Sequence, residues 1–275
     1  FSGMTITGAR LACLTIWKPL TSRMLAKRII ARLDIKPPQG VIKGLKFEGL
    51  RLMGDPYELA TRYAEDGADE LLYLDVAASL HGRPISLDLI TRTTRDVDIP
   101  LTVGGGIRTL EDIRAVLRAG ADKVAINSAA LENPTFITDA ARAFGSQAIV
   151  VSIEAKKCTR DHRRWVCMKW QGREQTDKDV LSWAAEAYDL GAGELLVTAV
   201  DHDGMRDGGD VELPFRLWHM NIPVVMSGGL GSAAEIRHAL IYADAVAIGS
   251  VLHYGVATIP SIKRYLHDQG VPVRL

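Results

Sequence analysis

Ile99-Pro-Leu-Thr-Val-Gly-Gly-Gly-Ile107 decides the fold, because a closely similar stretch occurs later in the chain. Ile222-Pro-Val-Val-Met-Ser-Gly-Gly-Leu230 repeats its pattern at an offset of 123 residues. Each copy is a short apolar run that ends in glycines, which is typical of a buried strand followed by a tight loop. A second pair, Gly67-Ala-Asp-Glu-Leu-Leu72 and Gly191-Ala-Gly-Glu-Leu-Leu196, recurs at an offset of 124 residues. The pattern therefore predicts two similar halves, with a period too long for a solenoid.

Short apolar runs alternate with amphipathic stretches along the rest of the chain. The predicted strands are Ile29–Ile35, Glu70–Val76, Pro100–Val103, Lys123–Ile126, Ala148–Ile153, Glu194–Val200, Pro223–Met226 and Ala245–Ile248. Helical patterns lie between them, among them Pro56–Asp66, Leu110–Arg118, Asp179–Leu190 and Ala233–Ile241. Eight strands with intervening helices in about 250 residues are typical of a parallel barrel. We predict an α/β fold, a (β/α)8 TIM barrel with a two-fold internal half-barrel repeat.

Composition and charge exclude several classes of protein. The 275 residues are 47% hydrophobic and 24% charged, which is ordinary for a globular protein. Lys+Arg and Asp+Glu both total 33, so the basic excess of a nucleic-acid-binding protein is missing. The sequence contains no run of 18 apolar residues, so it predicts no helix that spans a membrane. The chain has three cysteines, Cys13, Cys158 and Cys167, which cannot all pair in disulfides and are not spaced as CxxC. We therefore expect a reducing compartment and a cytoplasmic protein.

Residues 1–23 differ from the rest of the chain. They contain no acidic residue, and their apolar run Leu11–Trp17 is too short for a membrane helix or a clear signal peptide. We expect residues 1–23 to be an N-terminal extension that is disordered or an artefact of where the reading frame was opened, with a transit peptide as the alternative. Residues 24–275 are expected to form a single barrel domain.

Two glycine loops predict phosphate sites at the carboxyl ends of the strands. Glycine lets backbone N–H groups approach an anion closely, and a following helix N-terminus adds partial positive charge. A phosphate site after strands 7 and 8 recurs in this fold, and the repeat predicts a second after strands 3 and 4. Tight turns without a ligand are the alternative. The predicted phosphate-binding residues are Gly105, Gly106, Asn127, Ser128, Gly204, Gly228, Gly229, Gly249 and Ser250. Sites on opposite sides of the mouth imply a long substrate with a phosphate at each end.

Carboxylates at the strand ends are the catalytic candidates. Asp34 and Glu154 close the first and fifth strands at an offset of 120 residues, and Asp203 follows the sixth. Two facing carboxylates can act as general acid and general base if their surroundings separate their pKa values. A helix or loop cap is the alternative for each of them. The sequence contains no Walker loop and no cluster of histidines with metal-ligand spacing.

Several segments together resemble one family. They are Met24-Leu-Ala-Lys-Arg-Ile-Ile30, Val103-Gly-Gly-Gly-Ile-Arg108, Phe144-Gly-Ser-Gln147, Asp201-His-Asp-Gly204, Ser227-Gly-Gly229 and Gly270-Val-Pro-Val-Arg-Leu275. Over residues 24–275 the chain resembles the HisF family, the cyclase subunits of imidazole glycerol phosphate synthase. The resemblance implies that ammonia from a HisH-like glutaminase travels through the barrel and attacks a bis-phosphorylated ribulosyl-formimino-aminoimidazole carboxamide ribonucleotide. The implied products are imidazole glycerol phosphate and aminoimidazole carboxamide ribonucleotide (AICAR), with no metal or other cofactor.

The resemblance also implies roles for individual residues. Asp34 and Glu154 would be the general acid/base pair, Asp203 would support them, and Lys43 would lie in a mobile first loop. A charged ring at the bottom of the barrel would gate ammonia entry. Its members would be Arg28, Glu70, Lys123 and Glu194. Gln147 would lie on that same N-terminal face, where the glutaminase would dock.

Departures from the family pattern cluster around the reacting centre. Glu154 stands where the family usually has Asp, Arg32 where Cys is common, and Met205 where Thr follows Asp-Gly. The phosphate loops are unaffected. Two alternatives therefore stay open. One is a HisF-like paralogue that delivers ammonia in the amidation or amidine formation of cell-surface sugars. The other is a non-catalytic barrel that only activates a glutaminase partner.

Overall fold

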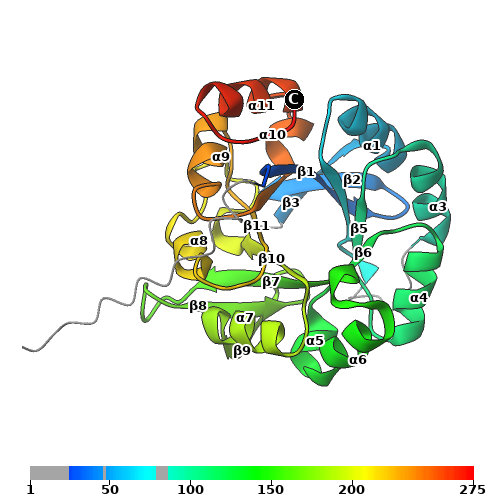
Figure 1. Cartoon of the computed structure of the whole chain (residues 1–275), viewed down its shortest axis with the longest axis vertical. Coiled ribbons are helices and arrows are strands. Elements are labelled where there is room, and N and C mark those ends of the chain that lie inside the picture. The colour runs from blue at the N-terminus through cyan, green and yellow to red at the C-terminus, as the bar shows by residue number, and fades with distance from the viewer. Residues whose placement is uncertain (1–24, 46–47, 79–85) are drawn as a thin grey trace, which may run out of the picture.

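The computed structural model describes residues 25–45, 48–78 and 86–275; the extension predicted over residues 1–23 lies outside them. Within these residues, parallel strands close into an eight-stranded barrel (Figure 1). The barrel strands are β1 (Arg28–Lys36), β4 (Glu70–Asp75), β5 (Leu101–Gly104), β6 (Lys123–Ile126), β7 (Ile149–Lys157), β10 (Glu194–Ala199), β11 (Val224–Ser227) and β12 (Ala245–Ile248). Pairing of β12 with β1 closes the ring. The predicted (β/α)8 barrel is confirmed.

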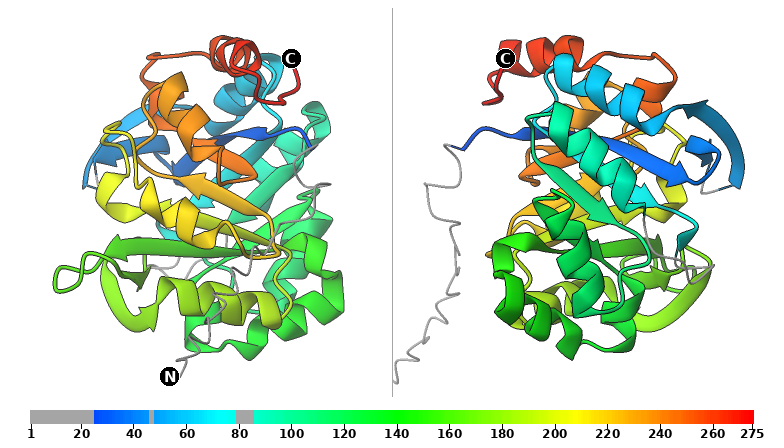
Figure 2. Two further views of the ribbon diagram at one scale, coloured as in Figure 1. Left: turned by 60° about the vertical axis from the view of Figure 1, so that its left-hand side comes forward. Right: turned by 90° about the vertical axis from the view of Figure 1, so that its right-hand side faces the viewer.

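Helices surround the barrel, as the views in Figure 2 show. The longer ones are α1 (Pro56–Glu65), α3 (Leu87–Asp96), α4 (Leu110–Arg118), α6 (Thr135–Phe144), α7 (Val180–Asp189), α8 (Glu212–Leu217), α9 (Ala233–Ala239) and α11 (Ile259–Asp268). Short turns of helix are α5 (Ser128–Glu132), η2 (Ser146–Ala148), η3 (Val200–His202) and α10 (Ser250–His253). Helices α4 and α9 both begin at a capping box, formed by Thr109 with Asp112 and by Ser232 with Glu235. These boxes directly follow the two glycine loops, so the internal repeat includes the helix starts.

Two antiparallel hairpins extend the barrel at equivalent places in the two halves. Strands β2 (Gly40–Leu45) and β3 (Glu48–Gly54) follow β1, and strands β8 (Trp165–Lys169) and β9 (Glu174–Asp179) follow β7. In the β8–β9 hairpin, Trp165 is only 1% exposed. It is buried because its ring packs in the core and its Nε1 donates to Asp210 over 2.6 Å.

Strand side chains alternate between the outer core and the barrel interior. Outward-facing residues pack under the helices in one large hydrophobic cluster. A separate apolar layer fills the barrel interior. It consists of Ile30, Leu72, Ala125, Val150, Leu196, Val225, Ala245 and Ala247. This layer separates the amino-terminal end of the barrel from the carboxyl-terminal end, where the predicted catalytic groups lie.

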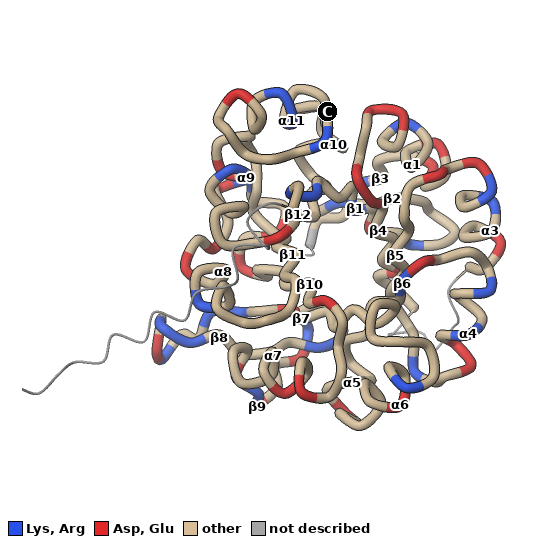
Figure 3. The backbone as a smooth tube through the Cα atoms, viewed as in Figure 1, with Lys and Arg blue, Asp and Glu red and all other residues tan. Residues whose placement is uncertain are grey.

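Charged residues of both signs are spread around the molecule (Figure 3). This distribution agrees with the equal totals of 33 basic and 33 acidic residues. In the part of the chain that the structure describes, no helix is both long and apolar enough to cross a membrane.

Candidate active site

Acidic and basic side chains meet inside the barrel at its carboxyl end. Arg32 and Asp34 both point inward because they lie two residues apart on β1. Arg32 Nε donates to Asp34 Oδ1 over 2.8 Å, and Lys43 Nζ donates to Asp34 Oδ2 over 2.7 Å. The same ammonium donates to both carboxylate oxygens of Asp203, over 3.1 and 3.0 Å. Lys43 therefore joins two of the three predicted catalytic carboxylates.

Lys43 does not lie in a loop, contrary to our expectation. It belongs to β2, which pairs antiparallel with both β1 and β3. The hairpin folds back beside the end of β1, and this brings the Lys43 side chain into the barrel mouth, where it is 3% exposed. Ion pairs with Asp34 and Asp203 compensate for the loss of hydration of the buried ammonium.

Glu154, the third predicted catalytic carboxylate, lies on β7 outside the Lys43 cluster. Its Oε2 accepts a hydrogen bond of 2.8 Å from the backbone N–H of Gly172 in the β8–β9 turn. Burial raises the pKa of Glu154 to about 7, although the Gly172 hydrogen bond and the Arg32 charge oppose this shift. A carboxyl group with this pKa is partly protonated at neutral pH.

The surroundings of Asp34 lower its pKa, whereas those of Glu154 raise the pKa of that carboxyl group. Burial alone would raise the pKa of Asp34, but the charges of Arg32 and Lys43 outweigh it. They hold the pKa of that carboxyl well below its usual range, so Asp34 is ionised at neutral pH. Asp34 and Glu154 thus have pKa values pushed apart, so the two carboxyl groups differ in protonation state at neutral pH.

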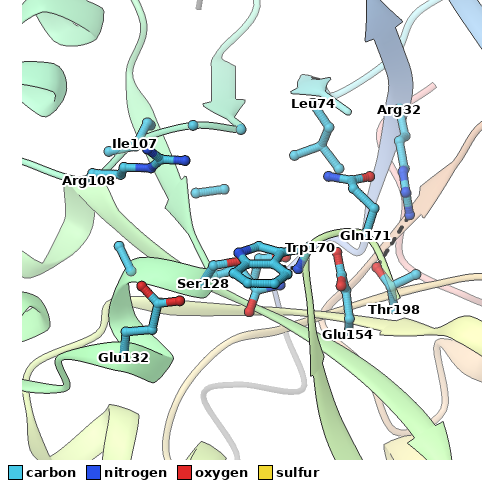
Figure 4. Close-up of a pocket in the computed structure, with 16 residues that line it drawn as sticks. Arg32, Leu74, Ile107, Arg108, Ser128, Glu132, Glu154, Trp170, Gln171 and Thr198 are labelled. Atoms are coloured by element: carbon cyan, nitrogen blue, oxygen red, sulfur yellow. Dashed lines mark hydrogen bonds between the residues drawn. The ribbon is translucent and has the colours of Figure 1, made fainter. Parts of the chain in front are cut away.

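A cavity of about 450 Å³ opens beside β5, β6 and β7 (Figure 4). The first glycine loop lines it with Gly105 and Gly106, and Asn127 and Ser128 at the start of α5 line it as well. Gly105 has a φ of +102°, and a Cβ there would lie 2.3 Å from the backbone oxygen of Asp75, so only glycine fits. Asn127 Oδ1 is buried without a hydrogen-bond partner among the described residues. Glu154 lines this cavity too.

The second glycine loop lies beside β11 and β12 around a smaller cavity of about 10 Å³. The predicted phosphate-binding residues that line it are Gly204, Gly228, Gly229, Gly249 and Ser250. Gly228 has a φ of +94°, and a Cβ there would lie 2.6 Å from the oxygen of Ala199. Arg32 lines both cavities, so the two glycine loops lie on either side of the Arg32–Asp34 pair.

The four predicted ring residues meet at the opposite end of the barrel. Arg28 donates to Glu70 over 2.6 Å and to Glu194 over 2.5 Å. Lys123 Nζ lies 3.2 Å from Glu70 and 2.9 Å from Glu194. Each cation therefore bridges both carboxylates. A cavity of about 740 Å³ opens on this face, and Arg28, Lys123, Glu194 and the exposed Gln147 of η2 line it.

Comparison with known proteins places the chain in a family. A family model described as "Histidine biosynthesis protein" matches residues 28–258. A curated imidazole glycerol phosphate synthase subunit HisF from Myxococcus xanthus is 47% identical over 254 residues, which cover 91% of this chain and 99% of the relative. A HisF subunit from Sulfurisphaera tokodaii is 47% identical over 253 residues, which cover 92% and 100%. The chain belongs to the HisF family.

Other strand-end groups of this HisF-family chain have structural roles. Asp75 Oδ1 accepts from the backbone N–H groups of Ala77 and Ala78, both over 2.9 Å. Asp201 Oδ2 accepts from the backbone N–H of Lys157 over 2.8 Å. These carboxylates have the capping role that was the alternative for Asp34, Glu154 and Asp203. Where the structure describes the chain, it contains no group of three or more His, Cys, Asp or Glu side chains that could hold a metal ion.

Sequence reasoning missed three residues of this HisF site. Arg32 was noted only as a departure from the family pattern, yet it also donates to Thr198 Oγ1 over 3.3 Å and to Ser227 Oγ over 3.0 Å. Trp170 and Gln171, in the turn between β8 and β9, line the larger cavity. The equivalence of β1 and β7 in the repeat was a usable signal, because it predicts that the segment after each strand reaches the same mouth.

Proposed function

We propose that this chain is the cyclase subunit of imidazole glycerol phosphate synthase in histidine biosynthesis. It uses ammonia from a glutaminase partner to convert the bis-phosphorylated ribulosyl-formimino-aminoimidazole carboxamide ribonucleotide to imidazole glycerol phosphate and AICAR. One observation carries this proposal: two buried carboxyl groups with separated pKa values, Asp34 and Glu154, lie between two glycine loops.

Proton transfer is the chemistry that these groups supply. Ammonia attack on the ribulosyl ketone creates an ammonium and an alkoxide on one carbon. Two protons must pass from this nitrogen to this oxygen before the oxygen leaves as water and an imine remains. Ionised Asp34 is the general base, and Glu154, protonated in part at neutral pH, is the general acid. Asp203 acts through Lys43, which it shares with Asp34. The glycine loops bind the two phosphates through backbone N–H groups.

Ammonia enters at the amino-terminal face. The ring of Arg28, Glu70, Lys123 and Glu194 is the gate, and the glutaminase docks over the cavity that Gln147 lines. Above the ring, the apolar interior layer admits neutral ammonia more readily than ammonium, because a charge is costly to transfer into apolar surroundings. This arrangement supports delivery of ammonia from a partner subunit rather than from bulk solvent.

The decisive experiment is a cyclase assay of the purified chain with the bis-phosphate substrate and an ammonium salt. Asp34→Asn should lower turnover by roughly a hundredfold or more, because general acid–base catalysis contributes at least that much. Substrate affinity should change little, because the glycine loops are intact. Asp161→Asn, in the exposed loop between β7 and β8, is the matched control and should behave as wild type. Wild-type turnover by Asp34→Asn would contradict the assignment.

Arg32 and Glu154 favour a second candidate function, because both departures from the family pattern lie at the reacting centre. In that case the chain is a HisF-like paralogue that delivers ammonia to a sugar pathway. A wild-type chain without cyclase activity that gains it on Glu154→Asp would support the paralogue. A chain that only stimulates a glutaminase, with no ammonia-dependent reaction of its own, would be the non-catalytic barrel.

A further inference from the structure

The turn between β8 and β9 has an unusual backbone for its sequence. Trp170, Gln171 and Gly172 have φ values of 52°, 63° and 72°, so three consecutive residues are left-handed. Hairpin turns usually place glycine, asparagine or aspartate at such positions, because a larger side chain is disfavoured there. A bulky Trp and a Gln in left-handed conformation cost stability, and such strain is concentrated at functional sites.

Contacts on both sides fix this turn against the candidate site. The backbone N–H of Trp170 donates to Ser128 Oγ over 3.3 Å, and that of Gly172 donates to Glu154 Oε2 over 2.8 Å. Lys169 Nζ lies 4.5 Å from the centroid of the Trp170 ring and pairs with Glu174 over 2.8 Å. The turn is therefore held to a predicted phosphate-binding residue on one side and to the predicted general acid on the other.

Both strained residues direct their side chains into the larger cavity. Figure 4 shows the Trp170 indole across the middle of the cavity, with Gln171 extending toward Leu74 and Arg32. A ligand whose phosphate binds at Gly105 and Gly106 would next contact the flat face of the Trp170 indole. Its following part would contact the Gln171 amide, which lies between the indole and the proposed reacting centre. This order matches a nucleoside monophosphate whose base carries a polar substituent.

We propose that Trp170 and Gln171 recognise the heteroaromatic carboxamide ring of the nucleotide half of the substrate. The indole stacks on the ring, and the Gln171 amide, which both donates and accepts, pairs with the carboxamide. The nucleotide half occupies this cavity of about 450 Å³ beside the first glycine loop, and the ribulosyl phosphate binds at the second glycine loop. The identity of the ring rests on the proposed function.

The test uses the double variant Trp170→Asn with Gln171→Gly, which gives the turn the residues that its backbone favours. We expect the melting temperature to rise and the dissociation constant for AICAR, measured by calorimetry on the full chain, to increase roughly tenfold to a hundredfold. Affinities for inorganic phosphate and ribose 5-phosphate should stay unchanged, because neither probe has the ring. Unchanged AICAR affinity, or a lower melting temperature, would overturn the inference.

Two further variants separate ring recognition from backbone strain. Trp170→Phe keeps a flat ring and should bind AICAR within a few-fold of wild type, whereas Trp170→Ala should not. Arg206 also has a left-handed backbone, with a φ of 57°, and does not line this cavity. Arg206→Gly removes that backbone strain and should change stability without changing AICAR affinity. Equal losses of AICAR affinity in Trp170→Phe and Trp170→Ala would overturn stacking.

A parallel cyclase assay distinguishes failure of the inference from failure of the proposed function. If the wild type cyclises the substrate but the double variant binds AICAR as well as wild type does, only the inference fails. If the wild type does not cyclise the substrate but binds AICAR in a Trp170-dependent way, the inference stands and the proposed reaction fails. No binding of AICAR by the wild type would overturn the inference directly.

Discussion

Arg32 and Asp34 form a buried ion pair between two residues of one strand, with Arg32 Nε 2.8 Å from Asp34 Oδ1. The guanidinium is held further by hydroxyl groups on β10 and β11, those of Thr198 and Ser227. It also lowers the pKa of Glu154 through its charge. One fixed cation therefore acts on both proposed members of the acid–base pair.

Replacing this cation should move the pH profile of the reaction. In Arg32→Met the pKa values of Asp34 and Glu154 both rise, because a positive charge that favours their ionised forms is removed. The alkaline limb of kcat/KM, which Glu154 sets, should therefore shift to higher pH, with rates expressed per concentration of free ammonia. Arg32→Lys, which keeps a charge, should shift it less. An alkaline limb at unchanged pH in Arg32→Met would show that Arg32 does not set the protonation of Glu154.

Glu154 should make the stability of the protein depend on pH. Its folded pKa of about 7 lies above its ordinary value of 4.5, so between these values the folded state binds more protons than the unfolded chain. Stability therefore falls as pH rises through that interval, by about 3 kcal/mol in total. Glu154→Gln should remove this loss, and urea unfolding of both proteins at pH 4.5 and 8 measures it. Parallel pH dependence of wild type and variant would contradict the assigned pKa.

The charged ring should couple the two subunits. Lys123→Ala removes two of the ion pairs and leaves Arg28 as the cation that bridges both glutamates. We expect a stability loss of about 1–3 kcal/mol, because the layer is only partly buried. Turnover with added ammonium should persist, whereas glutamine-dependent turnover in the complex should fall relative to glutamine hydrolysis. Equal loss of both activities would mean that Lys123 only holds the barrel together.

Gly105→Ala should be far more destabilising than a comparable change elsewhere. Gly105 and Gly67 both have positive φ values, +102° and +86°, so alanine is strained at either position. That backbone strain alone costs about 1–2 kcal/mol. Only at Gly105 would the new Cβ also meet backbone, at 2.3 Å from Asp75 O, whereas nothing lies within 4 Å at Gly67. Chemical denaturation should therefore show a loss for Gly105→Ala at least about 1 kcal/mol greater than for Gly67→Ala.

The barrel could be predicted because its signals are local and repeated. Apolar runs such as Lys123–Ile126 and Ala245–Ile248 have the bounds that were expected. The internal repeat showed which strands of the two halves are equivalent. Because Asp34 and Glu154 both lie at the ends of their strands, they were predicted to lie at the same mouth of the barrel. These features depend on periodicity and on topology rather than on the details of packing.

The rest of the site depends on contacts between distant segments. Lys43 is an ordinary charged residue in the sequence, and its burial follows only from carboxylates that β1 and the loop after β10 bring to it. Trp170 and Gln171 do not indicate a turn, because neither is one of the residues that favour left-handed backbone. The pKa of Glu154 likewise follows from burial that a single strand pattern does not specify.

The ring at the amino-terminal face contains more contacts than neutrality requires. Two ion pairs would neutralise its four charges, but Arg28 and Lys123 each contact both Glu70 and Glu194, giving four. Breaking any one contact leaves every member with a partner. In the proposed gate, one contact can therefore open while the other three hold the ring together, so that a small neutral molecule would pass without leaving any of the four charges unpaired.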